Sequence, residues 1–275
     1  MSPETAHWLM VLLFAVLGGA VGSFLNVVVY RLPNGLSLIS PPSHCPICKE
    51  PIRWYDNVPV FGWIMLGGKC RHCRCSIPVR YPAVEAITAA MFAALAVVED
   101  PLQAIFPDHL ILLCYHLMLL CTLLCSALIE IDGNRPPLRL FVPAIIVGIA
   151  VPLIWRAIAQ LAALPGLHST VAVDAIDVLA GFVASVVLSG VLCLIMLGWR
   201  RIHARSASDV GPLPTGWLLG LICAGTFLGW VMLFLLALVT LTAQGWLLFA
   251  GRVPPRLCVP PSVWLLVGTM TWLLV

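Results

Sequence analysis

The sequence predicts an all-α polytopic membrane protein with about eight transmembrane helices and a small zinc-binding loop domain on the cytoplasmic side. Composition is the first observation: of 275 residues, 61% are hydrophobic and 10% are charged, and the mean hydropathy is +1.03. A soluble domain carries about 25% charged residues. The second observation is a series of apolar runs long enough to cross lipid, and the third is a cluster of basic residues and paired cysteines between the first two runs.

The apolar runs define the spans, since a helix needs about 20 apolar residues to cross the hydrocarbon core. The candidate ranges are 8–29, 82–98, 110–131, 138–161, 174–198, 216–250 and 262–275. The range 216–250 has 35 residues and no charge, so two spans that meet near Gly229-Trp230 fit its length better than one tilted helix. The first run lacks the basic segment and the cleavage site of a signal peptide, and we expect it to be a retained helix.

Basic residues predict the orientation, because loops rich in Lys and Arg stay in the cytoplasm. The loop between the first two spans holds seven of the 15 Lys and Arg residues, whereas the ranges 99–109 and 162–173 hold none. Further basic residues follow the third, fifth and seventh spans of the eight-span count, so loops with and without Lys and Arg alternate. This pattern places the first loop in the cytoplasm and both ends of the chain outside. The net charge of +3 therefore indicates topology, and we expect no nucleic-acid partner.

Four cysteines in the loop 31–81 have the spacing of a metal site. They form the pairs Cys45-x2-Cys48 and Cys70-x2-Cys73, with 21 residues between the pairs. Two such pairs arrange four thiolates around one tetrahedral zinc ion, and a short segment rich in Pro and Gly needs such a cross-link to fold. Two disulfides are the alternative, but the predicted cytoplasmic location is reducing. Cys75 and His72 are near enough in sequence to compete as ligands.

Several motifs in the first third of the chain resemble those of the bacterial type IV prepilin peptidases. They are the runs Gly22-Ser23-Phe24-Leu25-Asn26, Ser43-His44-Cys45-Pro46-Ile47-Cys48, Trp54-Tyr55-Asp56-Asn57-Val58-Pro59 and Arg80-Tyr81-Pro82-Ala83-Val84-Glu85, within residues 18–88. The resemblance implies a bacterial inner-membrane enzyme that cleaves the leader of prepilins or pseudopilins and then methylates the new N-terminus with S-adenosylmethionine. It also implies a methyltransferase-like region over 1–98 that contains the cysteines, and a peptidase-like domain over 99–275.

Glu85 and the stretch Gly22–Asn26 would belong to the functional surface of the methyltransferase-like region, with Glu85 as the candidate cofactor-binding residue. The residues themselves give some support, because a carboxylate near the start of a membrane span is costly unless it is used. Small residues such as Gly22 and Ser23 are equally well explained by helix packing.

The peptidase half departs from the family pattern, in which two Asp residues meet at the membrane boundary. Prolines 137 and 143 set the register, and they place Glu130 at the first catalytic Asp and Asp132 at the next acid. The Gly-x-Gly-Asp motif is replaced by Ser206-Ala207-Ser208-Asp209. The extra methylene of Glu shifts its carboxylate, and a displacement of about 1 Å can cost about 100-fold in rate.

These residues leave three functional hypotheses. The first is a prepilin peptidase-like aspartic endopeptidase with Glu130, Asp132 and Asp209 as its acids. The second is an impaired pseudoenzyme that binds pilin-like helices, in which Glu130 and Asp132 only end a helix and Asp209 is an ordinary loop acid. The third is a methyltransferase alone. In each case zinc, the lipid bilayer and a pilin-like protein are the expected cofactor and partners.

Overall fold

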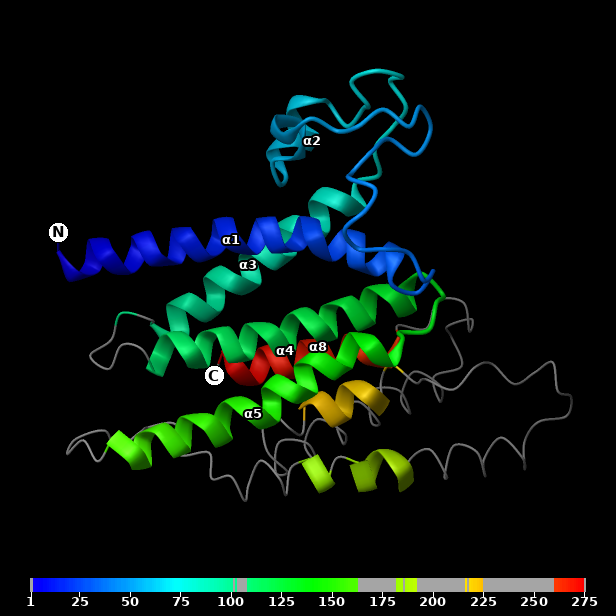
Figure 1. Cartoon of the computed structure of the whole chain (residues 1–275). Helices are drawn as coiled ribbons and strands as arrows, with labels where there is room; N and C mark the ends of the chain where they lie inside the picture. The colour runs from blue at the N-terminus through cyan, green and yellow to red at the C-terminus, as the bar shows by residue number, and fades with distance from the viewer. Residues whose placement is uncertain are drawn as a thin grey trace, which may run out of the picture. The chain divides into compact units, whose positions relative to one another are not determined.

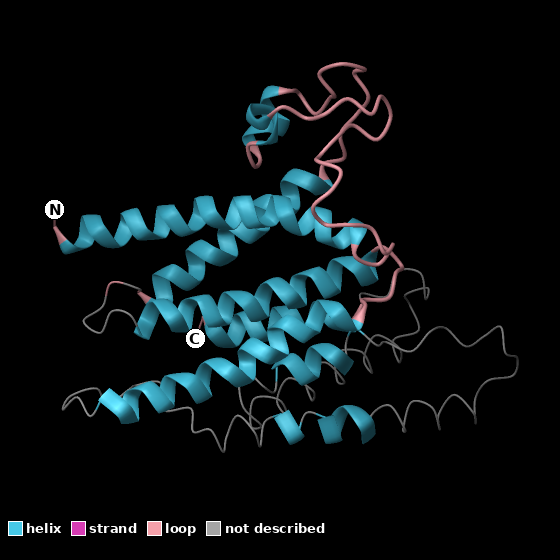
Figure 2. Cartoon of the chain, in the orientation of Figure 1, coloured by secondary structure: helices cyan, strands magenta, loops and turns pink. Residues whose placement is uncertain are grey.

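The computed structural model describes residues 2–100, 102, 108–162, 182–184, 186–191, 216, 218–224 and 260–274. Their elements are helical, and no strand is formed among them (Figure 2). The helices in chain order are α1 (Pro3–Arg31), η1 (Trp54–Asn57), α2 (Phe61–Met65), α3 (Arg80–Glu99), α4 (Asp108–Ile131), α5 (Leu138–Ala162) and α8 (Pro261–Leu273) (Figure 1). The chain divides into one compact unit over residues 1–113 and a second over 114–273.

Three helices are long and apolar enough to cross a membrane: Pro3–Arg31, Arg80–Glu99 and Leu110–Ile131. Together with the apolar helices α5 and α8, they occupy five of the predicted ranges, and the prediction of a helical membrane protein is confirmed. The ranges 174–198 and 216–250 lie mostly outside the described residues. Eight spans, the break near Gly229-Trp230 and the boundary between domains at residue 98 therefore stay predictions.

In the first unit, α1 and α3 pack closely because glycines face α3. A Cβ on Gly22 would lie 2.8 Å from the Cα of Glu85, and one on Gly18 would lie 2.8 Å from the side chain of Phe92. Small residues four apart let two helix backbones approach in lipid. At the other end of the pair, His7 Nδ1 lies 3.1 Å from Asp100 Oδ1.

The second unit has an apolar core around α4. Leu119, Leu123 and Phe141 are fully buried there, with Leu221 and Leu265 packed against them. The hydroxyl of Tyr115 donates to the carbonyl of Gly148 at 3.1 Å, which joins α4 to α5. After α4 the chain turns at Gly133, whose φ of +76° favours glycine.

Candidate functional site

The segment between α1 and α3, residues 32–79, contains two cysteine turns with the same backbone pattern. The amide of Cys45 donates to Glu50 O at 2.9 Å, and the amide of Cys70 donates to Cys75 O at 2.8 Å. The residue after each second cysteine has a left-handed backbone, with φ of 59° at Lys49 and 58° at Arg74. We call residues 32–79 the cysteine lobe. Its two turns are a structural repeat, in which each cysteine pair is held by the same backbone hydrogen bond and the same left-handed residue.

The four predicted cysteines come together in the lobe. The Sγ atoms of Cys45, Cys48, Cys70 and Cys73 all lie within 4.8 Å of one another. Cys45 Sγ is 3.7 Å from Cys73 Sγ, and Cys48 Sγ is 4.0 Å from Cys70 Sγ. A tetrahedral zinc ion with Zn–S bonds of about 2.3 Å separates its sulfur ligands by about 3.8 Å. The cluster therefore fits a metal ion with four thiolate ligands.

The backbone prepares one thiol of the cluster for metal binding. The amides of Cys48 and Ile47 point at the sulfur of Cys45 and lower the pKa of Cys45 to about 6. Amide donors favour the thiolate because they hydrogen-bond the charged form. Metals bind thiolates, so this thiol gives up its proton to a metal at little cost.

Cys75 adds a fifth thiol beside the cluster. Its sulfur is 3.6 Å from Cys45 Sγ, as close as the ligand pairs themselves. Within the repeat it takes the position that Glu50 takes in the first turn. The neighbouring thiols of Cys73 and Cys45 raise the pKa of Cys75 to about 12. His72 is not among the clustered ligands.

An ion pair fastens η1 to the second cysteine turn. Arg71 donates from Nε to Asp56 Oδ2 at 2.8 Å and from Nη2 to Asp56 Oδ1 at 2.5 Å. The guanidinium holds the pKa of Asp56 below its usual range. A bidentate pair of this kind fixes direction as well as distance, so it aligns the turn that carries Cys70 and Cys73.

Glu85 connects α3 to the lobe. It is mostly buried, and its Oε2 accepts the backbone amide of Val60 at 2.7 Å. Val60 has a φ of 61°, which is strained for a β-branched residue. The carboxylate therefore stabilises an unfavourable turn just before α2. This contact is a positioning role, and cofactor binding by Glu85 stays a prediction.

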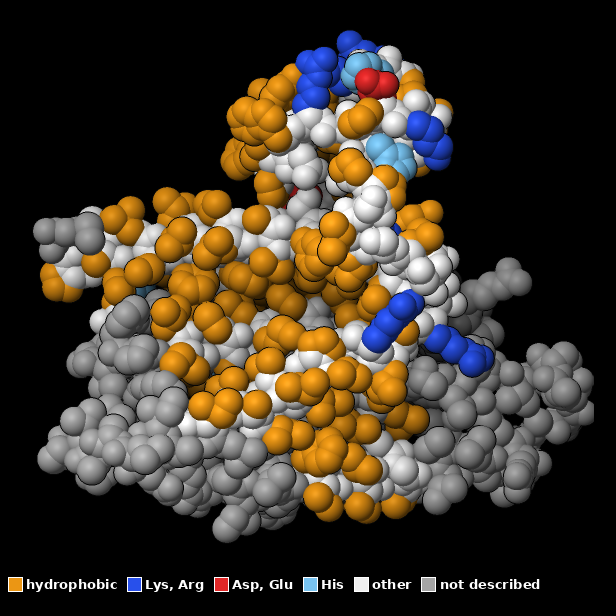
Figure 3. Space-filling view, viewed as in Figure 1, with side chains coloured by type: hydrophobic (Ala, Val, Ile, Leu, Met, Phe, Trp, Pro, Cys, Tyr) orange, Lys and Arg blue, Asp and Glu red, His pale blue; other side chains and the backbone are white. Residues whose placement is uncertain are grey.

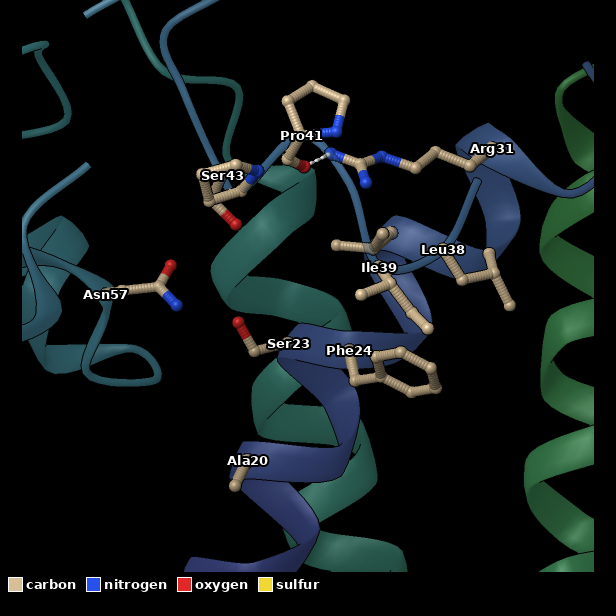
Figure 4. Close-up of a pocket in the computed structure, with 11 residues that line it drawn as sticks. Ala20, Ser23, Phe24, Arg31, Leu38, Ile39, Pro41, Ser43 and Asn57 are labelled. Carbon is tan, nitrogen blue, oxygen red and sulfur yellow. Dashed lines mark hydrogen bonds between the residues drawn. The ribbon is translucent and has the colours of Figure 1, made fainter. Parts of the chain in front are cut away.

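A groove of about 270 Å³ borders Ser23 and Phe24, which belong to the Gly22–Asn26 run in α1. Ser23 and Asn57 point into it from two elements, and Phe24 and Ile39 line its apolar side (Figure 4). Arg31 shapes its rim by donating to the carbonyls of Ser37 at 3.0 Å and Pro41 at 2.6 Å. Its lining mixes polar and apolar side chains.

In the second unit, Glu130 lies in the last turn of α4 within a polar cluster. Its Oε2 accepts the hydroxyl of Ser262, a fully buried residue in the first turn of α8, at 2.5 Å. A Cβ on Gly216 would overlap Glu130 Oε1. The hydroxyl of Ser126 is also buried there and has no hydrogen-bond partner among the described residues. The structure thus surrounds the predicted acid with small and hydroxyl side chains.

The other two predicted acids are placed differently. Asp132 follows α4 directly and is exposed, with its amide donating to Leu128 O at 3.1 Å. Asp209 lies outside the described residues, so its pairing with Glu130 stays a prediction. Nothing in the sequence singled out Ser262 as a partner of Glu130. The only hint is Pro260-Pro261-Ser262, a hydroxyl residue and prolines at a helix start.

Apolar helices and a lobe with four clustered thiols define a membrane protein with a candidate metal site. The chain matches the bacterial peptidase A24 N-terminal domain over residues 16–98. It is 30% identical over 219 residues to a prepilin leader peptidase/N-methyltransferase of Klebsiella pneumoniae, which covers 78% of this chain and 82% of that protein. The chain therefore belongs to the prepilin leader peptidase/N-methyltransferase family, and the predicted resemblance is confirmed.

Other relatives match over shorter regions. A prepilin leader peptidase/N-methyltransferase of Myxococcus xanthus is 38% identical over 135 residues, which are 49% of this chain and 38% of that protein. A type 4 prepilin-like proteins leader peptide-processing enzyme of Escherichia coli is 42% identical over 97 residues, and the match covers 36% of it. No solved structure matches the chain.

Proposed function

We propose that this chain is a membrane aspartic endopeptidase that removes the leader from type IV prepilins or pseudopilins at the cytoplasmic membrane face. The observation that carries the proposal is the polar surrounding of Glu130. A carboxylate at the C-terminal end of α4 faces the negative end of that helix dipole, so helix capping does not explain it. The first turn of α8 supplies the favourable, positive end of a dipole and the hydroxyl of Ser262.

Proteolysis of this kind needs two carboxylates with different protonation. One is ionised and takes a proton from the attacking water, and the other is protonated and polarises the scissile carbonyl. Glu130 is the first acid in this scheme and Asp209 is the second, with Asp132 as the nearby substitute for Glu130. The substrate helix would enter between the spans, with its leader junction at the cytoplasmic ends.

We also propose that the N-terminal unit methylates the new N-terminus. S-adenosylmethionine supplies the methyl group when bound, and Glu85 and the groove beside Ser23 and Arg31 are the candidate contacts. A zinc ion held by Cys45, Cys48, Cys70 and Cys73 would be structural, because four thiolates leave no open position. Support for this half comes from the family match over residues 16–98 and from the clustered thiols.

The test is cleavage of a purified prepilin by the full chain in detergent, with mass spectrometry of both products. We expect leader removal by the parent protein and its loss in Glu130→Gln, while Ser2→Ala, far from the acids in sequence, serves as the control. No cleavage by the parent at any pH would refute the peptidase. Methylation is read separately, as the mass added to the cleaved product when S-adenosylmethionine is present.

A second candidate is a pseudoenzyme that binds pilin-like helices without cutting them. The same contact favours it, because the hydrogen bond from Ser262 already occupies one oxygen of Glu130. A pull-down of pilin by the parent and by Glu130→Ala/Asp209→Ala separates the two candidates. Equal binding together with unchanged pilin processing in cells favours the pseudoenzyme. A methyltransferase alone is the third possibility, and it predicts methylation that needs the four cysteines but neither acid.

A further inference from the structure

The segment from Asn57 to Gly68 in the cysteine lobe has twelve residues and no charge. It contains α2, whose large apolar side chains face outward: Phe61 is 67% exposed, Ile64 58% and Met65 83%. Hydrophobic side chains cover the part of the lobe that holds α2, whereas Lys and Arg lie along the top of the lobe and on its opposite side (Figure 3). An exposed apolar patch of this kind, rimmed by polar residues, marks a contact surface.

The contacts of this segment place it beside the apolar part of α1. A Cβ on Gly19 would lie 3.3 Å from Pro59 Cβ, so Pro59 sits directly against the middle of α1. Gly19 precedes Arg31 by twelve residues, which is about 18 Å along the helix axis. Figure 1 draws α2 above the middle of α1 and not beyond the end of that helix. The segment therefore lies deeper along α1, toward its apolar middle, than the basic end of that helix at Arg31.

The part of α1 before Gly19 also exposes apolar side chains. Leu12, Leu13 and Val16 are each about half exposed or more, as expected for side chains that face lipid. Of the available solvents, only the bilayer covers the apolar side chains of both helices at once without a separate partner.

Most backbone amides of the segment have a partner within the protein, and a lipid environment requires such partners. The amide of Val60 donates to Glu85, and the amide of Gly68 donates to Trp63 O at 2.9 Å. The amides of Phe61, Gly62, Ile64, Leu66 and Gly67 also donate to carbonyls within the segment. The indole of Trp63 donates to Ile77 O at 3.0 Å.

We propose that the segment Asn57–Gly68 is embedded in the membrane beside α1, with Phe61, Ile64 and Met65 in contact with lipid acyl chains. The cysteine turns stay outside the hydrocarbon. Glu85 then has a defined task, because it pairs the one amide of the Val60 turn that would otherwise enter lipid without a partner. The embedded segment seats the metal-binding lobe at the bilayer surface, and this holds whether or not the chain cleaves prepilins.

The test is photo-crosslinking in native membranes with p-benzoylphenylalanine placed at Phe61 in one variant and at Ile47 in another. Ile47 is a matched control, since it is 69% exposed and lies in the first cysteine turn. Mass spectrometry after irradiation should find phospholipid adducts at position 61 and none at position 47. A third variant at Met65 should behave like the one at Phe61, and the zinc content of each variant reports whether the lobe is folded.

Two results would overturn the proposal. Lipid adducts that are equal at positions 61 and 47, or absent at both 61 and 65 in zinc-loaded protein, would place the segment in water. A protein adduct in place of lipid at positions 61 and 65 would show that the patch binds a second copy or a pilin-like helix.

Discussion

The fifth thiol of the cysteine lobe allows a sharp test of the metal site, because only one of the two repeated turns has it. Cys73 and Cys48 are equivalent ligands in the repeat, but Cys75 lies 3.6 Å from Cys45 Sγ, on the side of Cys73. A structural zinc site contributes about 10–16 kcal/mol, or about 3 kcal/mol for each of four ligands, so losing one ligand weakens binding about a hundredfold. We expect this loss in Cys48→Ser and a clearly smaller loss in Cys73→Ser.

The assay is competition for zinc between a colorimetric chelator and the purified full chain in detergent. In Cys73→Ser/Cys75→Ser, affinity should fall to the level of Cys48→Ser, because no replacement ligand is left. Cys75→Ser alone should bind zinc like the parent protein. Equal losses in Cys73→Ser and Cys48→Ser would refute the idea that Cys75 replaces a ligand, and so would a full loss in Cys75→Ser.

Three further predictions concern packing and charge. Gly22→Ala should lower the thermal unfolding temperature of the detergent-purified protein, since overpacking costs about 1–3 kcal/mol, while Gly190→Ala, which meets open space, should leave it unchanged. Glu85→Gln keeps an acceptor oxygen and should retain stability, whereas Glu85→Leu leaves a buried amide unpaired and should lose about 1–3 kcal/mol; equal stability of both variants would contradict the positioning role. Arg71→Met should lower the stability of the lobe at neutral pH, which is measured as faster digestion by a protease. Because Asp56 has a lowered pKa in the folded chain, its ion pair stabilises above about pH 4, and the difference between variant and parent should disappear as the pH falls through the folded pKa.

Local patterns were sufficient to predict the helices. The run 8–29 forms α1 and the run 110–131 forms α4 because a span depends on its own apolar residues and on lipid. The clustering of the cysteines was predictable for a related reason. The spacing within each pair forms one turn, and four thiols at this spacing can share one metal ion. The left-handed backbone at Lys49 and Arg74 was not predictable, because residues other than glycine rarely adopt it.

Contacts between distant segments were not predictable from the sequence. The bond between Glu85 and Val60 joins residues 25 apart, and the bond between Glu130 and Ser262 joins residues 132 apart. Each is a single pair, so it leaves no periodic pattern in the chain. The sequence marked Glu85 as a costly charge near the start of a span and Glu130 as a candidate acid of the family pattern, but their partners come from the packing of helices.

The tight packing of α1 against α3 at Gly18 and Gly22 has a consequence for how the lobe would bind the proposed zinc ion. Both ends of the lobe are fastened to one helical hairpin, so the closure of its loop is already accomplished before any ion arrives. An ion taken up by the first cysteine pair then meets the second pair at a high effective concentration. A substitution that loosens the packing of α1 against α3, far from any thiol, should therefore lower the affinity of the lobe for zinc.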